Sequence, residues 1–332
     1  MCHRYVFDAV SRTLCDIMHD ERPFGGIVTL LAGDFRQILP VVRLGRRAEI
    51  VDAALSRSPL WQQVVVMKLQ TNMRVENCAR DDDHVTTLRQ YADWLLLQLG
   101  GGKLPLTNDG DIRLPSELCV SSVDELTDFV FAGLATHSTD ADWISTRAIL
   151  CPRNAMVDAM NDRVLATFPG DVITCLSVDT VGEVGQQALY PVEYLNSLNL
   201  RGLPPHRLNI KVGAPIMLLR NMDPVRGHCN GTRYVVRMVS RRYIEAAIAS
   251  GEYAGNVLFI PRVPLSPTDA GLTLRRRQFP VRPAFAMTVN KAQGQTLTKC
   301  GVLLDEPVFT HGQLYVAASR CGDPQNIRSF CK

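Results

Sequence analysis

The chain of 332 residues is long enough for two or three domains, each of which can bury a core of its own. Hydrophobic residues make up 46% and charged residues 21%, as in ordinary globular proteins, and no apolar run approaches the roughly 18 residues that span a bilayer. The ten cysteines and seven histidines lack metal-ligand spacing, so we expect reduced thiols and no zinc site. The first residues lack the apolar core of a signal peptide, so we do not expect export.

The charge of the chain leaves its partner open. A net charge of +3 is too small to establish a nucleic-acid partner, but the basic residues comprise 30 arginines and only 6 lysines. Arginine is preferred where a phosphate is held by two hydrogen bonds. A GC-rich gene would produce the same bias, so both explanations stand.

The first third of the chain has an α/β pattern. Apolar residues at helical spacing predict helices over 5–19 and 85–99, and 48–63 is interpreted as a helix plus a turn. Two apolar runs, 27–32 and 64–69, are typical of buried strands in a parallel sheet. Polar residues follow each run, and a parallel sheet binds its ligands at the carboxyl ends of its strands.

A second α/β lobe is predicted to begin near residue 109, after a junction rich in Pro, Gly and Asp. It starts with a helix over 126–135, a strand over 148–152 and a helix over 155–166, which Asn154 could cap. Short strands with close turns between 191 and 270 then predict a small antiparallel barrel inserted in this lobe.

The stretch 279–321 combines three signals. A strand over 285–289 leads into the polar turn 290–296, a second apolar run covers 301–304, and a helix over 311–320 carries Arg320 out at its end. An arginine presented from a helix end suits a phosphate, because its planar fork makes paired contacts to anionic oxygens.

Five segments occur in the order GDFRQILP, LQTNMR, PPHRLNIKVGAPIMLLRNMDPVRGHCNGTR, FAMTVNKAQGQT and HGQLYVAASR. Together they resemble the Pif family of DNA helicases, in the RecD-like branch of superfamily 1, and especially the helicase part of Helitron-type transposons. The resemblance implies an α/β fold with two RecA-like parallel-sheet lobes, the first incomplete, and a small SH3-like β-barrel in the second. The domains expected are a partial first lobe over 1–108, a second lobe over 109–190 and 271–332, and the insertion over 191–270.

The same resemblance implies ATP and Mg²⁺ as ligands and single-stranded DNA as partner. Gln37 would contact the γ-phosphate, Asp34 would lie near the metal and the attacking water, and Arg74 and Arg320 would be γ-phosphate ligands. A plain structural interpretation also exists for these side chains: Asp34 and Gln37 could cap a turn, Arg74 could be a solvated loop residue, and Arg320 could complement a helix C-terminus.

Two further groups of residues come from the resemblance. Gln293 and Gly294 would line the nucleotide cleft, although turn chemistry alone explains them as well. Thr288, Asn290 and Lys291 would face DNA phosphates, although a solvated loop looks the same. The run 275–277 is either a solvated face or a DNA contact.

The phosphate loop G-x-x-x-x-G-K-[ST] does not occur in these 332 residues, because the one Gly-Lys pair, Gly102-Lys103, is followed by Leu104. An acidic Asp-Glu pair ahead of the helix near Tyr5 is missing too. We therefore expect the C-terminal portion of a longer helicase, which alone is poorly soluble or partly unfolded, is inactive, and has exposed strand edges in its first lobe.

The function expected from the resemblance is an ATP-dependent 5′-to-3′ DNA helicase in the nucleus. We expect no membrane partner; the sequence leaves the oligomeric state open, with a monomer favoured. It would serve DNA repair, recombination, telomere maintenance or transposition. One alternative is a non-catalytic remnant of a mobile-element helicase that binds single-stranded nucleic acid. Another is a purely structural fragment of a decayed mobile element.

Overall fold

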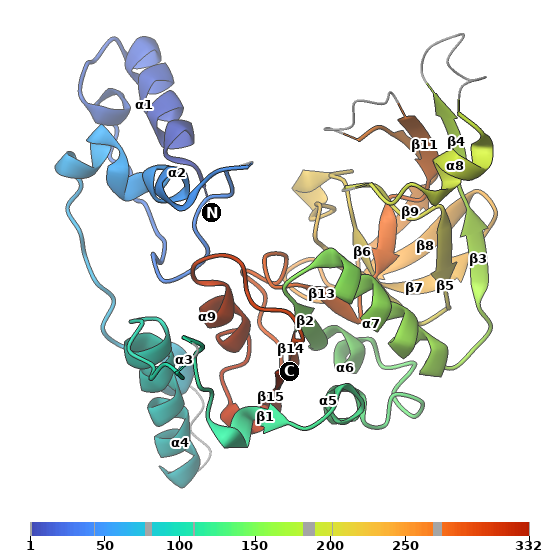
Figure 1. Ribbon diagram of the computed structural model, residues 1–332. Helices are drawn as coiled ribbons and strands as arrows, with labels where there is room; N and C mark the ends of the chain where they lie inside the picture. Colours follow the sequence, from blue (N-terminus) through green and yellow to red (C-terminus); the bar gives the residue numbers. More distant parts are fainter. Residues whose placement is uncertain are drawn as a thin grey trace. The chain divides into compact units, whose positions relative to one another are not determined.

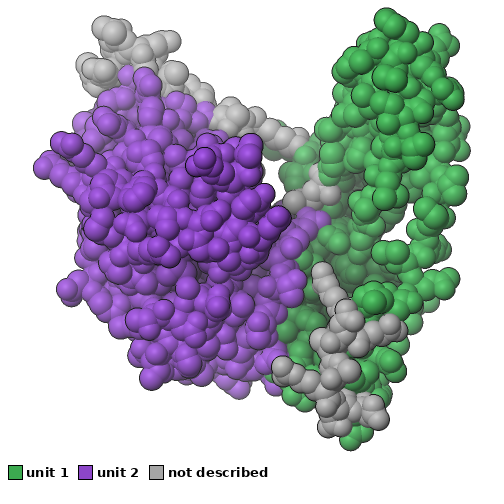
Figure 2. Space-filling view, turned by 180° about the vertical axis from the view of Figure 1, so that it is seen from behind, with its two compact units in different colours: residues 1–118, 306–325 green, residues 119–305, 326–332 purple. Residues whose placement is uncertain are grey.

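The structure, a computed structural model, describes residues 2–42, 44–76, 82–108, 110–181, 190–200, 202–267 and 274–331 (Figure 1). The chain forms two compact units. Unit 1 comprises residues 1–118 and 306–325, and unit 2 comprises 119–305 and 326–332; Figure 2 shows them in green and purple. The predicted lobe boundaries stay predictions.

Unit 2 is built on a parallel sheet of five strands in the order β1-β15-β14-β2-β13. The strands are β1 (Cys119–Val120), β15 (Ile327–Cys331), β14 (Lys299–Leu304), β2 (Arg147–Cys151) and β13 (Ala286–Thr288). The central strands β2 and β14 are almost wholly buried, as expected for near-continuous apolar runs covered on both faces. The predicted strands at 148–152 and 301–304 are confirmed.

Three helices of unit 2 contact this sheet: α5 (Val123–Phe131), α6 (Ala141–Ser145) and α7 (Asn154–Thr167). Their apolar faces form one core with the sheet, in which Leu126, Ile149 and Phe285 are fully buried. The proposed capping role of Asn154 is wrong, because the N-cap is Arg153 and Asn154 already lies inside the helix. The Asn154 amide oxygen instead accepts a hydrogen bond from Arg282.

The middle of unit 2 is antiparallel, as the short strands and close turns predicted. One sheet has the order β12-β6-β7-β8-β9, a second β10-β11-β4, and β3 pairs with β5. The bounds are β3 (Ile173–Leu176), β4 (Val178–Val181), α8 (Val192–Ser197), β5 (Arg207–Ile210), β6 (Pro215–Leu218), β7 (Arg233–Val239), β8 (Tyr243–Ile248), β9 (Val257–Pro261), β10 (Val263–Leu265), β11 (Leu274–Gln278) and β12 (Val281–Pro283). That these strands form an SH3-like barrel remains a prediction.

Arg233 ties the antiparallel part of unit 2 to its parallel sheet. The side chain is 5% exposed and donates hydrogen bonds to the carbonyls of Ser145, Arg147 and Ala284, at 2.6, 3.1 and 2.8 Å. Burial lowers the pKa of Arg233 to about 10, so this guanidinium remains charged at neutral pH. Three carbonyl dipoles compensate for the loss of water around it.

The first segment of unit 1 is helical. Helix α1 (Arg4–Met18) confirms the helix predicted over 5–19; it is followed by the 3₁₀ turn η1 (Pro23–Gly26), α2 (Arg47–Asp52), η2 (Leu55–Arg57) and η3 (Pro59–Gln63). Ser11 fixes η1 against α1 by accepting a hydrogen bond from the Phe24 amide at 2.9 Å, and Arg4 pairs with Asp52 at 2.8 Å.

The two strands predicted in the first third of the chain, 27–32 and 64–69, are wrong. Neither run belongs to a strand, and both expose apolar side chains: Val28 is 99% exposed and Leu69 102%. A strand obtains its backbone hydrogen bonds from a neighbour, and among the described residues no strand pairs with either run. Both runs therefore have the apolar pattern of buried strands but no neighbouring strand in the described structure with which to form a sheet.

The remaining helices of unit 1 are α3 (Met73–Glu76), α4 (Asp82–Asp93), the π-helical segment Trp94–Leu99 and α9 (Gln313–Ala318). The α4 segment and its continuation confirm the helix predicted over 85–99. Tyr91 on α4 donates a hydrogen bond to the Ala318 carbonyl at 3.0 Å, which attaches the C-terminal end of α9 to α4.

Candidate functional site

The first cluster of predicted site residues lies in unit 1, in the turn of the G-D-F-R-Q segment. Asp34 organises this turn: its carboxylate accepts a hydrogen bond from the Arg36 amide at 3.0 Å, and its carbonyl accepts one from the Gln37 amide at 3.2 Å. An aspartate that bonds the backbone two residues ahead is a common way to form a tight turn. Asp34 and Gln37, both partly buried, therefore lie together.

Helix α9 is bound directly to this turn. The Tyr315 hydroxyl donates to the second carboxylate oxygen of Asp34 at 3.0 Å, across 281 positions of sequence. Burial, followed by the Asp34 charge and the hydrogen bond to it, raises the pKa of Tyr315 to about 12, so the phenol remains protonated as a donor. Tyr315 was not among the predicted site residues, although it lies inside the Y-V-A-x-S-R segment.

Backbone packing reinforces the contact between turn and helix. Gly312, the N-cap of α9, has φ of +74°, and a Cβ built there would lie 2.5 Å from the Gln37 carbonyl oxygen. A Cβ on Gly100 would lie 2.7 Å from the Arg36 side chain and 3.0 Å from the Tyr315 ring. Side chains at either position would separate the elements, so the two glycines allow the close approach.

Arg320 follows α9 but is not presented at the helix end as the sequence suggested. It is 8% exposed, and its guanidinium donates to the Val316 carbonyl at 2.9 Å and to the Ser319 hydroxyl at 2.8 Å. The helix stops at Ala318, so the next turn folds the arginine back over the last carbonyls, an ordinary use of a cation at a helix C-terminus.

Arg74 lies in α3, and its side chain is outside the described part of the chain.

The second cluster of predicted residues lies in unit 2, directly after strand β13. Thr288 ends the strand, and Asn290, Lys291, Gln293 and Gly294 form the turn that follows. Gly294 has φ of +85°, a left-handed conformation that glycine adopts at least cost. The structure thus brings these five residues together at one strand end.

Lys291 is the cation of this cluster and is held in place. Its ammonium donates to the Asn230 side chain at 2.9 Å. Burial, and then the neighbouring Arg282 charge, lower the pKa of Lys291. Lys291 and Thr288 border a small pocket of about 10 Å³, roughly the space of one water molecule, together with Arg282 and Asn154.

Arg282 is the residue that sequence reasoning missed in this pocket. Its guanidinium donates to Asn154 at 3.2 Å, and it lies 3.8 Å from the carboxylate of Asp158, too far for a strong pair. Two cations, a hydroxyl and the first turn of α7 therefore meet at one point, a combination that attracts anions. Nothing in the sequence pattern connects position 282 with position 154, because only the pairing of β12 and the packing of α7 bring them together.

The described residues do not complete a magnesium site. No group of three or more His, Cys, Asp or Glu side chains among them could hold a metal ion. Both carboxylate oxygens of Asp34 already accept hydrogen bonds, from Arg36 and Tyr315.

In the described ranges, no helix is both long and apolar enough to cross a membrane.

Comparison with protein families gives two matches. Residues 1–110 match the model of the PIF1-like helicase, and residues 193–238 match the model of the 2B domain of the DNA helicase Pif1. The human ATP-dependent DNA helicase PIF1 is 28% identical over 98% of this chain and 46% of its own length. The zebrafish (Danio rerio) protein of the same name is 28% identical over 97% of this chain and 43% of its own length. The chain therefore spans slightly less than half the length of these relatives.

Solved structures give the same fold. The crystal structure of Pif1 helicase from Candida albicans has a TM-score of 0.60 at 22% identity and covers 99% of this chain and 70% of its own. The Bacteroides Pif1 structure bound to single-stranded DNA has a TM-score of 0.58 at 22% identity, over 99% and 68%. Its complex with ADP-AlF3 and single-stranded DNA has a TM-score of 0.57 at 20% identity, over 99% and 68%. The likeness at this identity concerns the fold, a mixed α/β architecture with a RecA-like parallel sheet.

Proposed function

Because the chain belongs to the PIF1-like helicase family, we propose that it forms the part of an ATP-dependent DNA helicase that responds to the nucleotide and holds single-stranded DNA. The observation that carries this proposal is the hydrogen bond between Tyr315 and Asp34. This hydrogen bond joins the turn that contains Gln37 to the helix that precedes Arg320. The family resemblance implies that Gln37 and Arg320 both contact the γ-phosphate.

The geometry supports a mechanical link between these segments. A phosphate bound at Gln37 displaces the turn, and the Asp34–Tyr315 hydrogen bond and the close Gly312 backbone contact carry that displacement to α9. Arg320 follows, because its guanidinium is bonded to the Val316 carbonyl of the same helix. In phosphoryl transfer, catalysis depends mostly on positioned charge, so moving one arginine changes the rate.

The DNA side of the proposal rests on the Lys291 pocket. Lys291, Arg282 and Thr288 supply two cations and a hydroxyl donor at the end of β13, suited to a backbone phosphate. We propose Asn290 as a further DNA contact and Gln293 and Gly294 as nucleotide contacts, together with Arg74 from α3. Movement in the 5′-to-3′ direction, a nuclear location and a monomeric state belong to the same proposal.

The DNA contact can be tested on the 332-residue chain itself. Lys291→Gln removes one phosphate contact, so its affinity for a labelled oligothymidine should fall by about 10-fold and the salt slope by about 0.7. Fluorescence anisotropy measures both quantities. Lys103→Gln is the matched control, since Lys103 is exposed. Equal affinities of Lys291→Gln and Lys103→Gln would refute the phosphate role of Lys291.

The nucleotide contacts need a protein that joins these residues to a phosphate loop. There, Arg320→Lys should reduce ATP turnover by about 10³-fold or more, as loss of an arginine finger does. The 332 residues alone should show no ATP turnover, because they contain no phosphate-loop motif. Turnover by these residues alone would show that the nucleotide is held in another way.

The missing motif also favours a second candidate, a non-catalytic module that binds single-stranded nucleic acid. DNA affinity that is independent of ATP in the native protein would support the module. Strand separation driven by ATP would exclude it and support the helicase, whose activity serves repair, recombination, telomere maintenance or transposition.

A further inference from the structure

Three basic side chains lie at the amino ends of three adjacent strands of the parallel sheet in unit 2. Lys299 begins β14, Arg147 begins β2, and Arg328 is the second residue of β15. Arg147 and Lys299 are direct partners in the register, and Arg328 is the partner of Gly301, two residues after Lys299. We call Arg147, Lys299 and Arg328 the amino-edge cluster. It lies at the opposite end of the strands from Lys291, which follows the carboxyl end of β13.

The three side chains of the cluster leave the same face of the sheet. Side chains alternate along a strand and parallel partners share a face, so Lys299, Gly301 and the two arginines are on one side. A Cβ on Gly301 would lie 2.9 Å from the Val130 side chain and 3.2 Å from that of Leu126, both on α5. The shared face is therefore the one that α5 covers. Neighbouring strands are about 5 Å apart, so the cluster is compact.

Aromatic rings hold the three cations of the cluster in place. The Lys299 ammonium lies 4.3 Å, and the guanidinium carbon of Arg328 4.8 Å, from the centre of the Phe129 ring on α5. The guanidinium carbon of Arg147 lies 4.0 Å from the centre of the Trp143 ring, and its Nη1 donates to the Trp143 carbonyl at 2.9 Å. An aromatic face attracts a cation through its quadrupole and does not neutralise it, so the positive charges remain.

The positive charges of the cluster act on one another. Burial, and then the charges of Arg147 and Arg328, lower the pKa of Lys299. Burial also lowers the pKa of Arg147, and the more distant charge of Asp140 opposes this shift. In the described part of the chain, no ion pair joins Arg147 or Lys299 to a carboxylate. An anion bound between these side chains would therefore relieve a repulsion that the chain itself leaves in place.

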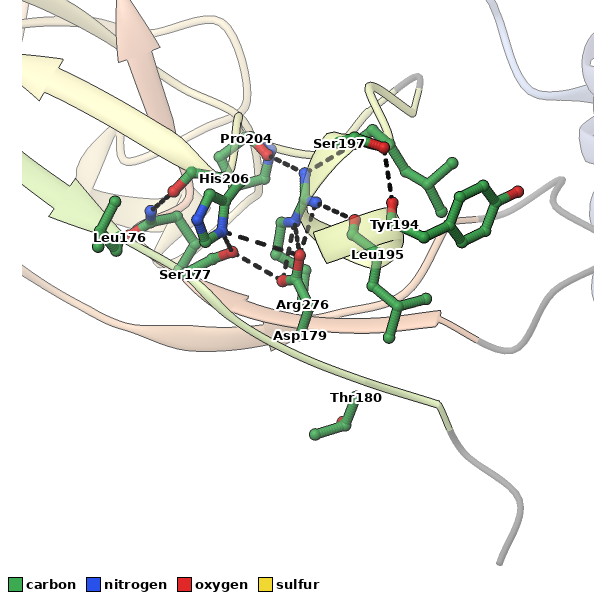
Figure 3. Close-up of polar contacts among 12 residues, drawn as sticks. Leu176, Ser177, Asp179, Thr180, Tyr194, Leu195, Ser197, Pro204, His206 and Arg276 are labelled. Carbon is green, nitrogen blue, oxygen red and sulfur yellow. Dashed lines mark hydrogen bonds and ion pairs between the residues drawn. The ribbon is translucent and has the colours of Figure 1, made fainter. Parts of the chain in front are cut away.

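Unit 2 treats a cation that serves only the fold differently. Arg276 is fully buried and makes a two-pronged ion pair with Asp179, with guanidinium–carboxylate distances of 2.7 to 3.1 Å (Figure 3). Its remaining N–H groups donate to the carbonyls of Leu195, Leu198 and Pro204. This network fixes the register of β11 against β4, and the adjacent Arg275 and Arg277 are exposed.

The amino-edge cluster differs from this network in both respects. Within the described ranges, Arg147 and Lys299 have no carboxylate like Asp179, and all three side chains of the cluster are only half-buried. An anion from solution can therefore reach them.

We propose that the amino-edge cluster binds a chain of linked phosphate groups, either an inorganic polyphosphate or the phosphates of a nucleotide. Linked phosphates place several negative charges and acceptor oxygens close together, which matches three cations on neighbouring strands. A single carboxylate brings one charge and would leave most of the cluster uncompensated. The cluster shares no residue with the Lys291 pocket or with the turn at 34–37, so this proposal does not depend on the proposed function.

The test measures binding of tripolyphosphate and, separately, of ATP to the 332-residue chain by isothermal titration calorimetry. The double variant Lys299→Gln/Arg328→Gln removes two of the three cations, so the affinity for both ligands should fall by about 10-fold or more, as expected for lost charge-assisted hydrogen bonds. Lys299→Arg keeps the charge and should keep the binding. If the double variant does not fold, Lys299→Gln alone gives the same test, because the Lys299 side chain makes no hydrogen bond within the described ranges.

The matched control is Arg12→Gln/Lys103→Gln, which removes one arginine and one lysine from exposed positions outside the cluster. Circular dichroism of each variant confirms folding. If the two double variants bind tripolyphosphate equally well, or the native chain binds neither ligand, the proposal is overturned.

Two comparisons identify the occupant and separate this site from the Lys291 pocket. Tighter binding of ATP than of tripolyphosphate supports a nucleotide as the occupant, and the reverse supports an inorganic chain. Lys291→Gln should leave the affinity for tripolyphosphate unchanged; if it alone weakens this binding, the phosphates occupy the Lys291 pocket and the cluster proposal fails. Binding of oligothymidine tests the proposed function independently, and it should be the same for Lys299→Gln/Arg328→Gln and its control.

Discussion

Arginine is the residue type whose meaning changed most between sequence and structure. Its abundance was compatible with phosphate binding or with codon bias. The structure adds a third use: Arg233 and Arg276 are buried and hold backbone carbonyls, and Arg320 folds back onto its own helix. Which arginines remain available for an anion, such as Arg275 and Arg282, is decided by burial and pairing.

Tyr315 is the residue on which the proposed link between turn and helix can be tested most directly. Tyr315→Phe removes the hydroxyl that donates to Asp34 but leaves the ring in place, so the free energy of unfolding at pH 7 should fall by about 1 kcal/mol. Urea unfolding followed by circular dichroism measures this loss. Tyr253→Phe is the control, because Tyr253 is exposed and should change it by less than about 0.5 kcal/mol.

The same pair of variants has a pH signature. The pKa of Tyr315 is raised to about 12, above that of an unfolded tyrosine near 10, so the folded state holds this proton more tightly. Its contribution is fully present below about pH 10 and is lost as the pH rises towards 12. The stability difference between the native chain and Tyr315→Phe should therefore shrink over this range; a constant difference would contradict the assignment.

At the scale of elements, the close contact between α9 and the turn at 34–37 can be tested at Gly312, one of the two glycines that allow it. Gly312→Ala places a Cβ against the Gln37 carbonyl in a left-handed backbone conformation, so unfolding free energy should fall by about 2 kcal/mol or more. Gly322→Ala is the matched control, because nothing lies within 4 Å of a Cβ there. Chemical denaturation compares the two, and a loss as small for Gly312→Ala as for Gly322→Ala would show that the elements are not in close contact.

For the whole molecule, the two exposed apolar runs of unit 1 dominate the behaviour expected in solution. Leu30 is 82% and Leu69 102% exposed, so each run presents apolar side chains that are open to association. The variant Leu30→Lys/Leu69→Lys should be several-fold more soluble and bind less of the dye ANS, with no loss of thermal stability. Sedimentation and ANS fluorescence check this.

The control for this prediction is Ile149→Lys, which puts a charge into the fully buried core of unit 2 and should abolish cooperative unfolding. A marked fall in the melting temperature of Leu30→Lys/Leu69→Lys would instead mean that the two runs are packed in the native protein.

The sequence by itself determined the resemblance to PIF1-like helicases, the α/β class, the helices α1 and α4, the strands β2 and β14, and the antiparallel middle of the chain. Local periodicity and short ordered motifs carry this information, because each depends on residues close together in the chain. Whether the apolar runs at 27–32 and 64–69 become strands was not determined locally, since a strand needs a partner to receive its hydrogen bonds.

Only the tertiary structure decided which side chains meet. The Tyr315–Asp34 bond spans 281 positions, the Arg276–Asp179 pair 97, and the Arg282–Asn154 contact 128. No periodic signal links such distant positions. The exposure of Arg275 and Arg277 likewise follows from the register of β11 against β4, and burial of Arg276 fixes this register. The sequence shows only three consecutive arginines and does not indicate which of them is buried.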